Sequence, residues 1–423
     1  MSLRRVILAV AALLALPTFA SAQTSRIEGM SLPGDYVKDY TGIYTYPSCV
    51  TGVGNLVYGE LGITGTAGVT PGDRSVGAVL QNLFDGKLGT WGVHLRELTP
   101  SLGQGDFISS TNVGTDGFDP NVNTNESFDL MWGRKFGTTS LGIRLNRSYY
   151  QAKTEPLAGV ETKFQYDATA GGSPNLARNV WGVGGGLSFE SSANMRSDVS
   201  FLYQSRSWES TTGTTKDESD GNGSYLLAAR AFYQWEPNVV LVPVFKYYSY
   251  DLSEKLAGPP VTTFDNSLKG WQAGVAGNWT VGNNDLFVLG VAFAQNKVEQ
   301  AEAVFAIDTD PTAPGTQAMT DGKSTETLAP EVFAALETHV NNWLTLRFGA
   351  SKSAYRKLKV EPTAGGNSET TTSPFSMNIG AGVKLATLQL DAVLSQDFPQ
   401  TLGWIGSGNA GVYFPKVTAT YAF

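Results

Sequence analysis

Beyond about residue 50, hydrophobic and polar side chains alternate with a period of two, which is typical of β-strands with two different faces. In the stretch 271–281, Trp271 and Val275 fall on one face, whereas Gln272 and Gly274 fall on the other. Glycine opposite tryptophan favours the wall of a barrel with a wet interior over the core of a soluble sandwich. A strand that faces lipid needs apolar groups on one side only.

This template predicts about sixteen strands. They are expected near residues 54–62, 74–83, 89–97, 127–136, 139–151, 179–190, 194–208, 223–236, 239–252, 270–281, 285–299, 327–339, 343–357, 374–384, 387–396 and 414–423. Many have the roughly nine to eleven residues that a tilted strand needs to cross a bilayer. The pattern therefore predicts an all-β fold: a transmembrane antiparallel up-and-down β-barrel.

Tight links alternate along the chain with long polar stretches. The tight links include Glu236-Pro237-Asn238 and Asn341-Asn342, and the long stretches lie near 98–126, 152–178, 209–222, 253–269, 300–326, 358–373 and 397–413. Strict alternation places every second connection on the same rim. Outer-membrane barrels have this arrangement, with short periplasmic turns and long outer loops.

The last predicted strand has the form of a barrel-assembly signal. Val417, Ala419, Tyr421 and the terminal Phe423 share one face, opposite polar or small residues. A terminal aromatic residue with apolar residues at alternating positions before it resembles the C-terminal signal of outer-membrane proteins. We therefore expect the barrel-assembly machinery and outer-membrane lipid to be partners of this chain.

The first 22 residues have the composition of a secretory signal peptide. A basic start is followed by an apolar run over residues 6–16 and by the small-residue triplet Ala20-Ser21-Ala22. The apolar run is too short for a permanent membrane-spanning anchor helix. The predicted organisation is a signal peptide (1–22), a periplasmic or plug-like segment (23–53) and the barrel (54–423).

Charge and composition exclude several classes of function. Cleavage after Ala22 removes two arginines and shifts the formal net charge from −8 to −10, which argues against nucleic-acid binding. The only histidines, His94 and His339, lie far apart, and no clustered metal ligands are visible. The sequence predicts no cofactor and no enzyme, with a hydrolase built from distant strands as the alternative. The single cysteine, Cys49, is expected to be a buried free thiol rather than half of an intermolecular disulfide.

If the apolar faces point to lipid, the opposite faces line the lumen. The candidate lumen-lining residues are His94, Arg96, Asp129, Lys135, Arg144, Arg206, Arg230, Glu331, Glu337, Arg347 and Asp391. Mixed charges of this kind filter solutes in some pores. In other barrels they form ion pairs that fill the interior. Both interpretations stay open at this point.

Aromatic residues near strand ends predict interfacial girdles. They are Tyr149-Tyr150, Trp208, Tyr233, Trp235, Tyr247-Tyr248, Tyr250, Trp343 and Trp404.

The segment before the first strand resembles that of the long-chain fatty-acid transporter (FadL-like) superfamily. Gly29-Met30, Asp35, Asp39 and Ile43-Tyr44 match elements of its N-terminal hatch, while Tyr46-Pro47-Ser48 keeps only the proline of its Asn-Pro-Ala motif. Membership would imply uptake of hydrophobic compounds through a plugged barrel. That family usually has about fourteen strands, in which case the first two predicted strands would belong to the hatch.

The prediction from sequence is an outer-membrane channel or transport barrel for small solutes, partly occluded by residues 23–53. One alternative is FadL-like uptake of hydrophobic compounds. Another is a non-conducting surface or structural barrel with partner-binding loops.

Overall fold

A computed structural model describes residues 24–62, 74–81, 83–103, 124–152, 175–212, 215–221, 223–257, 261–282, 284–308, 317–363, 366–394 and 416–423. The predicted signal peptide, residues 1–22, lies outside these ranges. No helix within them is long and apolar enough to span a membrane.

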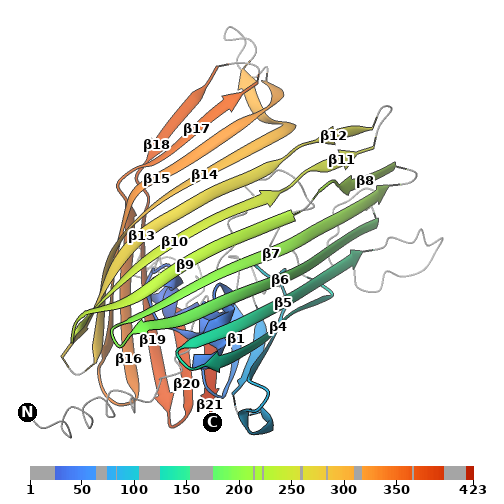
Figure 1. Cartoon of the computed structure of the whole chain (residues 1–423). Helices are drawn as coiled ribbons and strands as arrows, with labels where there is room; N and C mark the ends of the chain where they lie inside the picture. Colours follow the sequence, from blue (N-terminus) through green and yellow to red (C-terminus); the bar gives the residue numbers. More distant parts are fainter. Residues whose placement is uncertain are drawn as a thin grey trace, which may run out of the picture.

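Among the described residues, sixteen antiparallel strands form the wall (Figure 1). Their bounds are β1 (Leu56–Gly62), β2 (Ser75–Leu80), β3 (Thr90–Arg96), β4 (Glu126–Phe136), β5 (Thr139–Ala152), β6 (Asn175–Ser192), β7 (Met195–Thr212), β9 (Gly223–Glu236), β10 (Val239–Asp251), β13 (Ser267–Val281), β14 (Asp285–Asp308), β15 (Gln317–His339), β16 (Leu344–Ser353), β19 (Phe375–Leu385), β20 (Leu388–Leu394) and β21 (Lys416–Ala422). Each pairs with the next one in this order.

The last strand closes the ring on the first. In the register of β1 with β21, Leu56 lies opposite Ala422 and Gly62 lies opposite Lys416. Closure removes both sheet edges, so every wall strand has two hydrogen-bonded neighbours. The prediction of about sixteen strands is confirmed. The fourteen-strand alternative is wrong, because β1 and β2 form part of the wall and not of a hatch.

Several stretches predicted as loops are strands. β7, β14 and β15 extend beyond the predicted bounds, and five further short strands continue the sheet at the long-loop rim: β8 (Thr215–Ser219), β11 (Glu254–Leu256), β12 (Thr262–Phe264), β17 (Arg356–Pro362) and β18 (Ser368–Thr372). In Figure 1, β17 and β18 lie near the top of the view, and β8, β11 and β12 lie at its right. Beyond the lipid both faces of a strand meet water, so the alternation that predicts strands disappears there.

The outer face of the wall is apolar. On β6, Trp181 is 57% exposed and Val183 is 50% exposed, while the serine and glycines on the opposite face are buried or half-buried. On β21, the outward side chains include Tyr421 and Phe423, which are 48% and 60% exposed. Large apolar side chains that face outward on a closed barrel, with ionisable side chains buried inside, suit a lipid surround.

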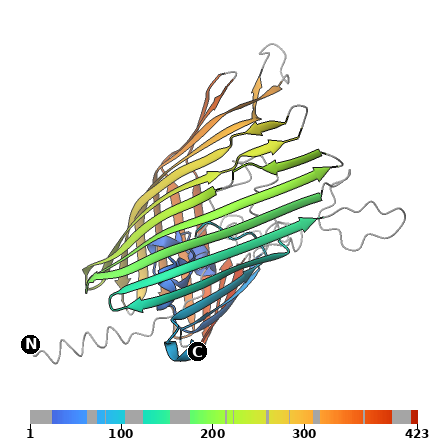
Figure 2. The same ribbon diagram turned by 45° about the vertical axis from the view of Figure 1, so that its right-hand side comes forward.

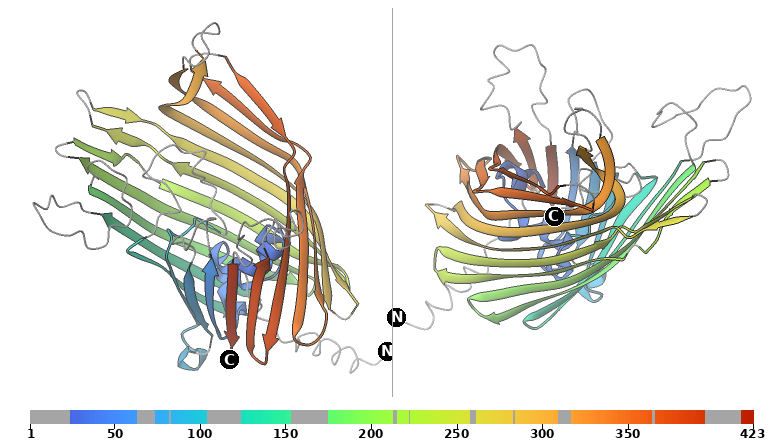
Figure 3. Two further views of the ribbon diagram at one scale, coloured as in Figure 1. Left: turned by 180° about the vertical axis from the view of Figure 1, so that it is seen from behind. Right: turned by 90° about the horizontal axis from the view of Figure 1, so that it is seen from above.

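The N-terminal residues lie inside the ring (Figures 1 and 2). They form α2 (Thr24–Gly29) and three 3-10 helices, η1 (Gly34–Tyr36), η2 (Tyr40–Tyr44) and η3 (Pro47–Gly52). A fourth 3-10 helix, η4 (Leu83–Gly86), belongs to the turn between β2 and β3. Seen from above, the elements of residues 24–53 are surrounded by wall strands (Figure 3). We call residues 24–53 the N-terminal segment.

Candidate functional site

Helix α2 is bound to the wall by four polar contacts with three strands. Ser25 Oγ lies 2.7 Å from Thr418 Oγ1 of β21. From the same strand, Lys416 Nζ donates to Glu28 Oε1 at 2.7 Å. Asn378 of β19 donates to the Glu28 carbonyl at 2.7 Å. The fourth contact, between Arg26 and β15, lies at the centre of a larger network.

Arg26 joins a chain of buried charges that runs across three wall strands. Its Nε and Nη2 each donate to a different carboxylate oxygen of Glu337 at 2.8 Å. Arg347 Nε of β16 donates to the same carboxylate at 2.6 Å and also pairs with Asp391 of β20. Arg26 Nη1 lies 3.8 Å from Asp39 Oδ2 within the N-terminal segment. Burial raises the pKa of Asp39 to about 6, an effect that Arg26 partly offsets.

The middle of the N-terminal segment is bound to the opposite side of the wall. Lys246 of β10 forms an ion pair with Asp35. Asn278 Nδ2 of β13 donates to the Tyr36 carbonyl at 2.8 Å. Arg230 Nη1 of β9 donates to the Asp35 carbonyl at 3.2 Å. Each contact uses an inward side chain of a different strand, so the segment bridges the lumen.

A second charge network surrounds Cys49. Asp198 of β7 accepts from Arg230 Nε at 2.9 Å and from Arg196 Nε at 3.1 Å. The buried Cys49 Sγ lies 3.5 Å from Asp198 Oδ2 and 3.4 Å from Arg196 Nη2. The guanidinium of Arg230 also stacks over the ring of Tyr46, 4.3 Å from its centroid. The prediction that Cys49 is a buried free thiol is confirmed.

A third network holds η2. Asp129 of β4 pairs with Arg96 and with Arg144, whose Nε donates at 2.8 Å. Arg144 Nη1 donates to the Tyr44 carbonyl at 2.8 Å. The hydroxyl of Tyr44 contacts His94 and lies 2.7 Å from the hydroxyl of Tyr58 on β1. Both arginines also lie over the Tyr44 ring.

Wall glycines allow the backbone of the N-terminal segment to touch the sheet. A methyl group added at Gly142 or Gly186 would meet Pro47 and Ser48, and one added at Gly349 would overlap the Met30 carbonyl. Gly186 belongs to the glycine-rich face of β6. Large inward side chains at these positions would displace the segment, so small residues set its distance from the wall.

The structure brings together most of the predicted lumen residues. Those engaged in the three networks are His94, Arg96, Asp129, Arg144, Arg230, Glu337, Arg347 and Asp391. Three others lie apart. Lys135 is exposed at the tight-turn rim beside Glu190, Arg206 donates to Gln204 at 3.0 Å, and Glu331 is half-buried on the inward face of β15.

Sequence reasoning missed several members of these networks. Asp198 lies on the same face of its strand as the predicted Arg206, and period-two counting would have found it. Lys246 is surrounded in sequence by the aromatic residues of β10, so the pattern there predicts a girdle and not a lumen charge. Asp35 and Asp39 were noted only as elements of a resemblance. Their partners come from strands far away in sequence, for which local alternation gives no signal.

The girdle prediction is wrong for three aromatic residues. Tyr233, Trp235 and Trp343 are exposed at the tight-turn end, as predicted. Tyr248 and Tyr250 are fully buried inside, and Trp208 is 8% exposed. In a run such as Tyr247-Tyr248, alternation forces one ring inward.

These inward rings belong to an apolar patch on the inner wall, between the N-terminal segment and the long-loop rim. The patch consists of Trp208, Leu226, Tyr248, Tyr250, Leu268 and Val298, and it is continuous with Tyr40 and Ile43 of the segment. The lumen therefore combines polar networks around the segment with an apolar wall above it.

No family model matches this chain, and no curated protein matches it in sequence. The described residues form a sixteen-stranded closed ring with an apolar exterior and a polar interior. The fold is that of an outer-membrane β-barrel.

Among solved structures, a FadL homologue from Pseudomonas aeruginosa is 10% identical with a TM-score of 0.44, over 95% of this chain and 98% of that chain. The toluene transporter TodX of Pseudomonas putida is 10% identical with a TM-score of 0.39, over 95% and 97%. The ferric yersiniabactin uptake receptor FyuA from Yersinia pestis is 11% identical with a TM-score of 0.43. The match covers 80% of this chain and spans 53% of that receptor. At these identities the likeness concerns the fold alone.

Proposed function

We propose that this barrel is a transport passage of the bacterial outer membrane, closed by the N-terminal segment in the state described here. One observation carries the proposal: the segment bridges the lumen through contacts with inward side chains of strands on all sides of the ring. A segment held in this way blocks diffusion along the barrel axis. Its displacement would open a path lined by the charged residues that now hold it.

The polar character of these contacts favours a movable closure rather than a permanent filling of the lumen. Replacing buried ion pairs by well-packed apolar groups is often neutral or stabilising, so ion pairs are a weak way to fill a lumen for stability alone. Water that enters the lumen solvates both partners of a pair such as Arg26 and Glu337 after they separate. Charged contacts therefore separate at lower cost than a dry apolar interface of equal area.

The second candidate is uptake of hydrophobic compounds, which the FadL-like resemblance implies. The apolar patch above the N-terminal segment favours it, because the buried rings of Trp208, Tyr248 and Tyr250 would offer apolar contacts to a solute once they are uncovered. A polar solute would find its partners only among the charged networks. Flux of paired polar and apolar probes of similar size separates the two candidates.

A reversible disulfide between segment and wall tests the closure. Ser48 Oγ lies 2.7 Å from Ser188 Oγ of β6, close enough for a disulfide between cysteines placed at both positions. In a Cys49→Ser background, S48C/S188C is expected to show low conductance in planar bilayers when oxidised and higher conductance when reduced. The single variants S48C and S188C should not respond to oxidant.

A second disulfide at the other end of the segment makes the test independent of one site. Ser25 and Thr418 offer the same geometry, with hydroxyl oxygens 2.7 Å apart. Absence of conductance in both redox states of both pairs would contradict a channel. It would favour the third interpretation, a non-conducting structural barrel with partner-binding loops.

We further propose that residues 1–22 export the chain and that Val417, Ala419, Tyr421 and Phe423 guide its insertion. Their outward position on β21 suits recognition by the barrel-assembly machinery, because these side chains are not consumed by contacts inside the lumen. The bacterial outer membrane is the location that this combination supports.

A further inference from the structure

The outer face of the barrel carries a group of lysines above its apolar belt, over β13 to β17. We call the group the lysine patch. Its members are Lys269, Lys297, Lys323, Lys352, Lys357 and Lys359. All belong to the outward faces of their strands.

The level of the patch follows from the strand that carries Lys269. On the outward face of β13, Trp271, Val275 and Val281 are exposed apolar side chains. The ten residue steps from Trp271 to Val281 cover roughly 33 Å along the strand. At a strand tilt of about 40° this becomes about 25 Å along the barrel axis, which is the height of a lipid-facing belt. Lys269 is the next outward residue beyond Trp271, so it lies at the headgroup level.

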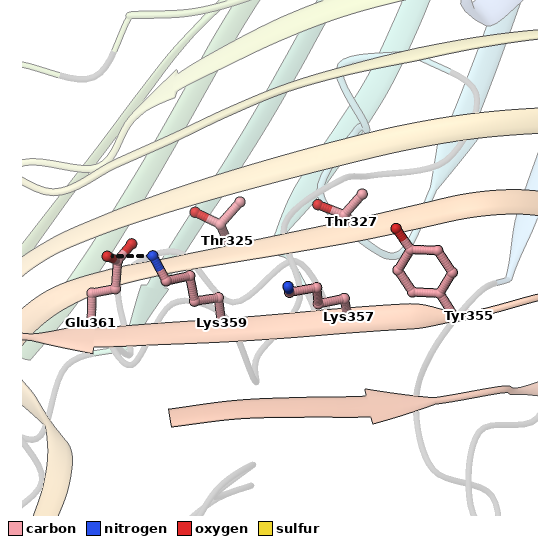
Figure 4. A pocket seen from close by; sticks show the side chains of 6 residues that line it. All are labelled: Thr325, Thr327, Tyr355, Lys357, Lys359 and Glu361. Carbon is pink, nitrogen blue, oxygen red and sulfur yellow. Dashed lines mark hydrogen bonds and ion pairs between the residues drawn. The ribbon is translucent and has the colours of Figure 1, made fainter. Parts of the chain in front are cut away.

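The strand register places Lys297 and Lys359 in one row with Lys269 across the sheet. Lys269 lies opposite Lys297, which lies opposite Thr325, which in turn lies opposite Lys359. One row closer to the lipid, Thr327 lies opposite Lys357. A groove of about 320 Å³ lies between β15 and β17 (Figure 4). It is lined by Thr325, Thr327, Tyr355, Lys357, Lys359 and Glu361.

The patch has an excess of positive charge. Three glutamates accompany the six lysines: Glu299 binds Lys297 and Lys323, Glu361 binds Lys359, and Glu369 binds Lys357. Within the described part of the chain, Lys269 and Lys352 have no carboxylate partner.

The opposite side of the barrel lacks this excess. Among the described residues at the long-loop rim over β4 to β8, the outward ionisable side chains are Glu126, Arg147, Glu209, Lys216 and Glu218, which pair with one another. The surface charge of the barrel at the headgroup level is therefore asymmetric.

We propose that the lysine patch binds the phosphate groups of a phosphorylated glycolipid in the leaflet at the long-loop rim. Ammonium groups are strong partners for phosphate, and the hydroxyls of Thr325 and Thr327 add donors in the same groove. Val332 and Phe375, which lie opposite Lys352 on the neighbouring strands, are 45% and 53% exposed and offer an apolar surface to acyl chains. A lipid satisfies both surfaces at once, whereas free phosphate would use only the charged one.

Two matched double variants test the proposal. Lys297 and Lys357 are 50% and 38% exposed in their side chains, and each pairs with a glutamate. Lys216 and Lys255, on other strands, are 47% and 41% exposed and likewise paired. K297Q/K357Q therefore removes the same charge as K216Q/K255Q, but only the former removes it from the patch.

The full-length barrel in detergent is titrated with a bisphosphorylated glycolipid and with its dephosphorylated form, and bound lipid is read by native mass spectrometry. Wild type and K216Q/K255Q are expected to prefer the phosphorylated lipid. K297Q/K357Q should bind it roughly 10- to 30-fold more weakly. Equal binding of both lipids by wild type, an equal loss in both variants, or full competition by millimolar inorganic phosphate would overturn the proposal. Heat-modifiable migration confirms that each variant is folded.

Discussion

Arg26 and Glu337, separated by 311 positions in the chain, form a buried two-point ion pair between helix α2 and strand β15. The pair connects the N-terminal segment to the wall at a point where Arg347 shares the same carboxylate. Two cations on one carboxylate make Glu337 the central member of the network. Its removal takes the two-point partner from Arg26 and one of two carboxylates from Arg347, while removal of Arg26 leaves Glu337 paired with Arg347.

Glu337→Gln should therefore loosen the N-terminal segment more than Arg26→Gln does. Loss of one partner of a buried ion pair costs about 3–5 kcal/mol. We expect faster proteolysis of residues 24–53 and a higher open-channel frequency in E337Q, with smaller changes in R26Q. Glu209→Gln, which removes an exposed carboxylate, serves as the control and should match wild type. The opposite order of the two variants would show that Glu337 is not the central member.

Gly349→Ala should displace the segment without unfolding the barrel. A methyl group at this position overlaps the Met30 carbonyl, and the wall backbone is fixed by two neighbouring strands. The segment is expected to shift, which raises conductance while heat-modifiable migration stays normal.

Gly185→Ala is the matched control for this change. Gly185 lies on the outward face of β6, and an added methyl group there meets nothing within 4 Å. Unchanged conductance in G349A, or an equal change in G185A, would contradict the role of glycine in the fit of the segment.

Phe423→Ala should lower the amount of folded barrel in the outer membrane several-fold. Phe423 is 60% exposed on the outward face and stacks on Tyr421, with ring centroids 6.1 Å apart. Phe423 contributes nothing to the lumen networks. A lower amount of folded barrel in F423A would therefore reflect assembly or anchoring of the barrel rather than closure of the lumen. Ala422→Ser, on the opposite face, is the control. Immunoblots of outer-membrane fractions give the measurement, and equal levels of F423A and wild type would refute the assembly signal.

Docking of the segment should strengthen in acid through Asp39. Its pKa of about 6 inside the barrel exceeds the value of about 4 that it has in water. The protonated form is therefore favoured in the docked state, and this contribution is lost as the pH rises from about 4 through 6. Hydrogen exchange of residues 39–44, corrected for intrinsic rates, should show greater protection at pH 5 than at pH 7.5.

Asp39→Asn removes the titrating group from this comparison. The variant is expected to show a smaller difference in protection between the two pH values than wild type does. A difference of the same size would assign the effect to another group.

The order of residues along the chain is enough to assign the strands, their faces and the two rims. Alternation is a local property with a period of two, and lipid enforces it because every outward position must be apolar. Trp181 and Val183 point outward and Gly186 inward for this reason, and the sixteen strands follow from the same count. The signal fails beyond the lipid, and for this reason the alternation predicts loops where β8, β11, β12, β17 and β18 lie.

Which inward residues meet depends on the folded ring. Arg26 finds Glu337, and Asp35 finds Lys246, because barrel closure and strand register place distant inward positions around one segment. The lysine patch also arises from register, since Lys269, Lys297 and Lys359 come from three separate strands. The direction of a side chain follows from the residues next to it in the sequence. Contact across the lumen or along a row of strands depends on the shape of the whole ring.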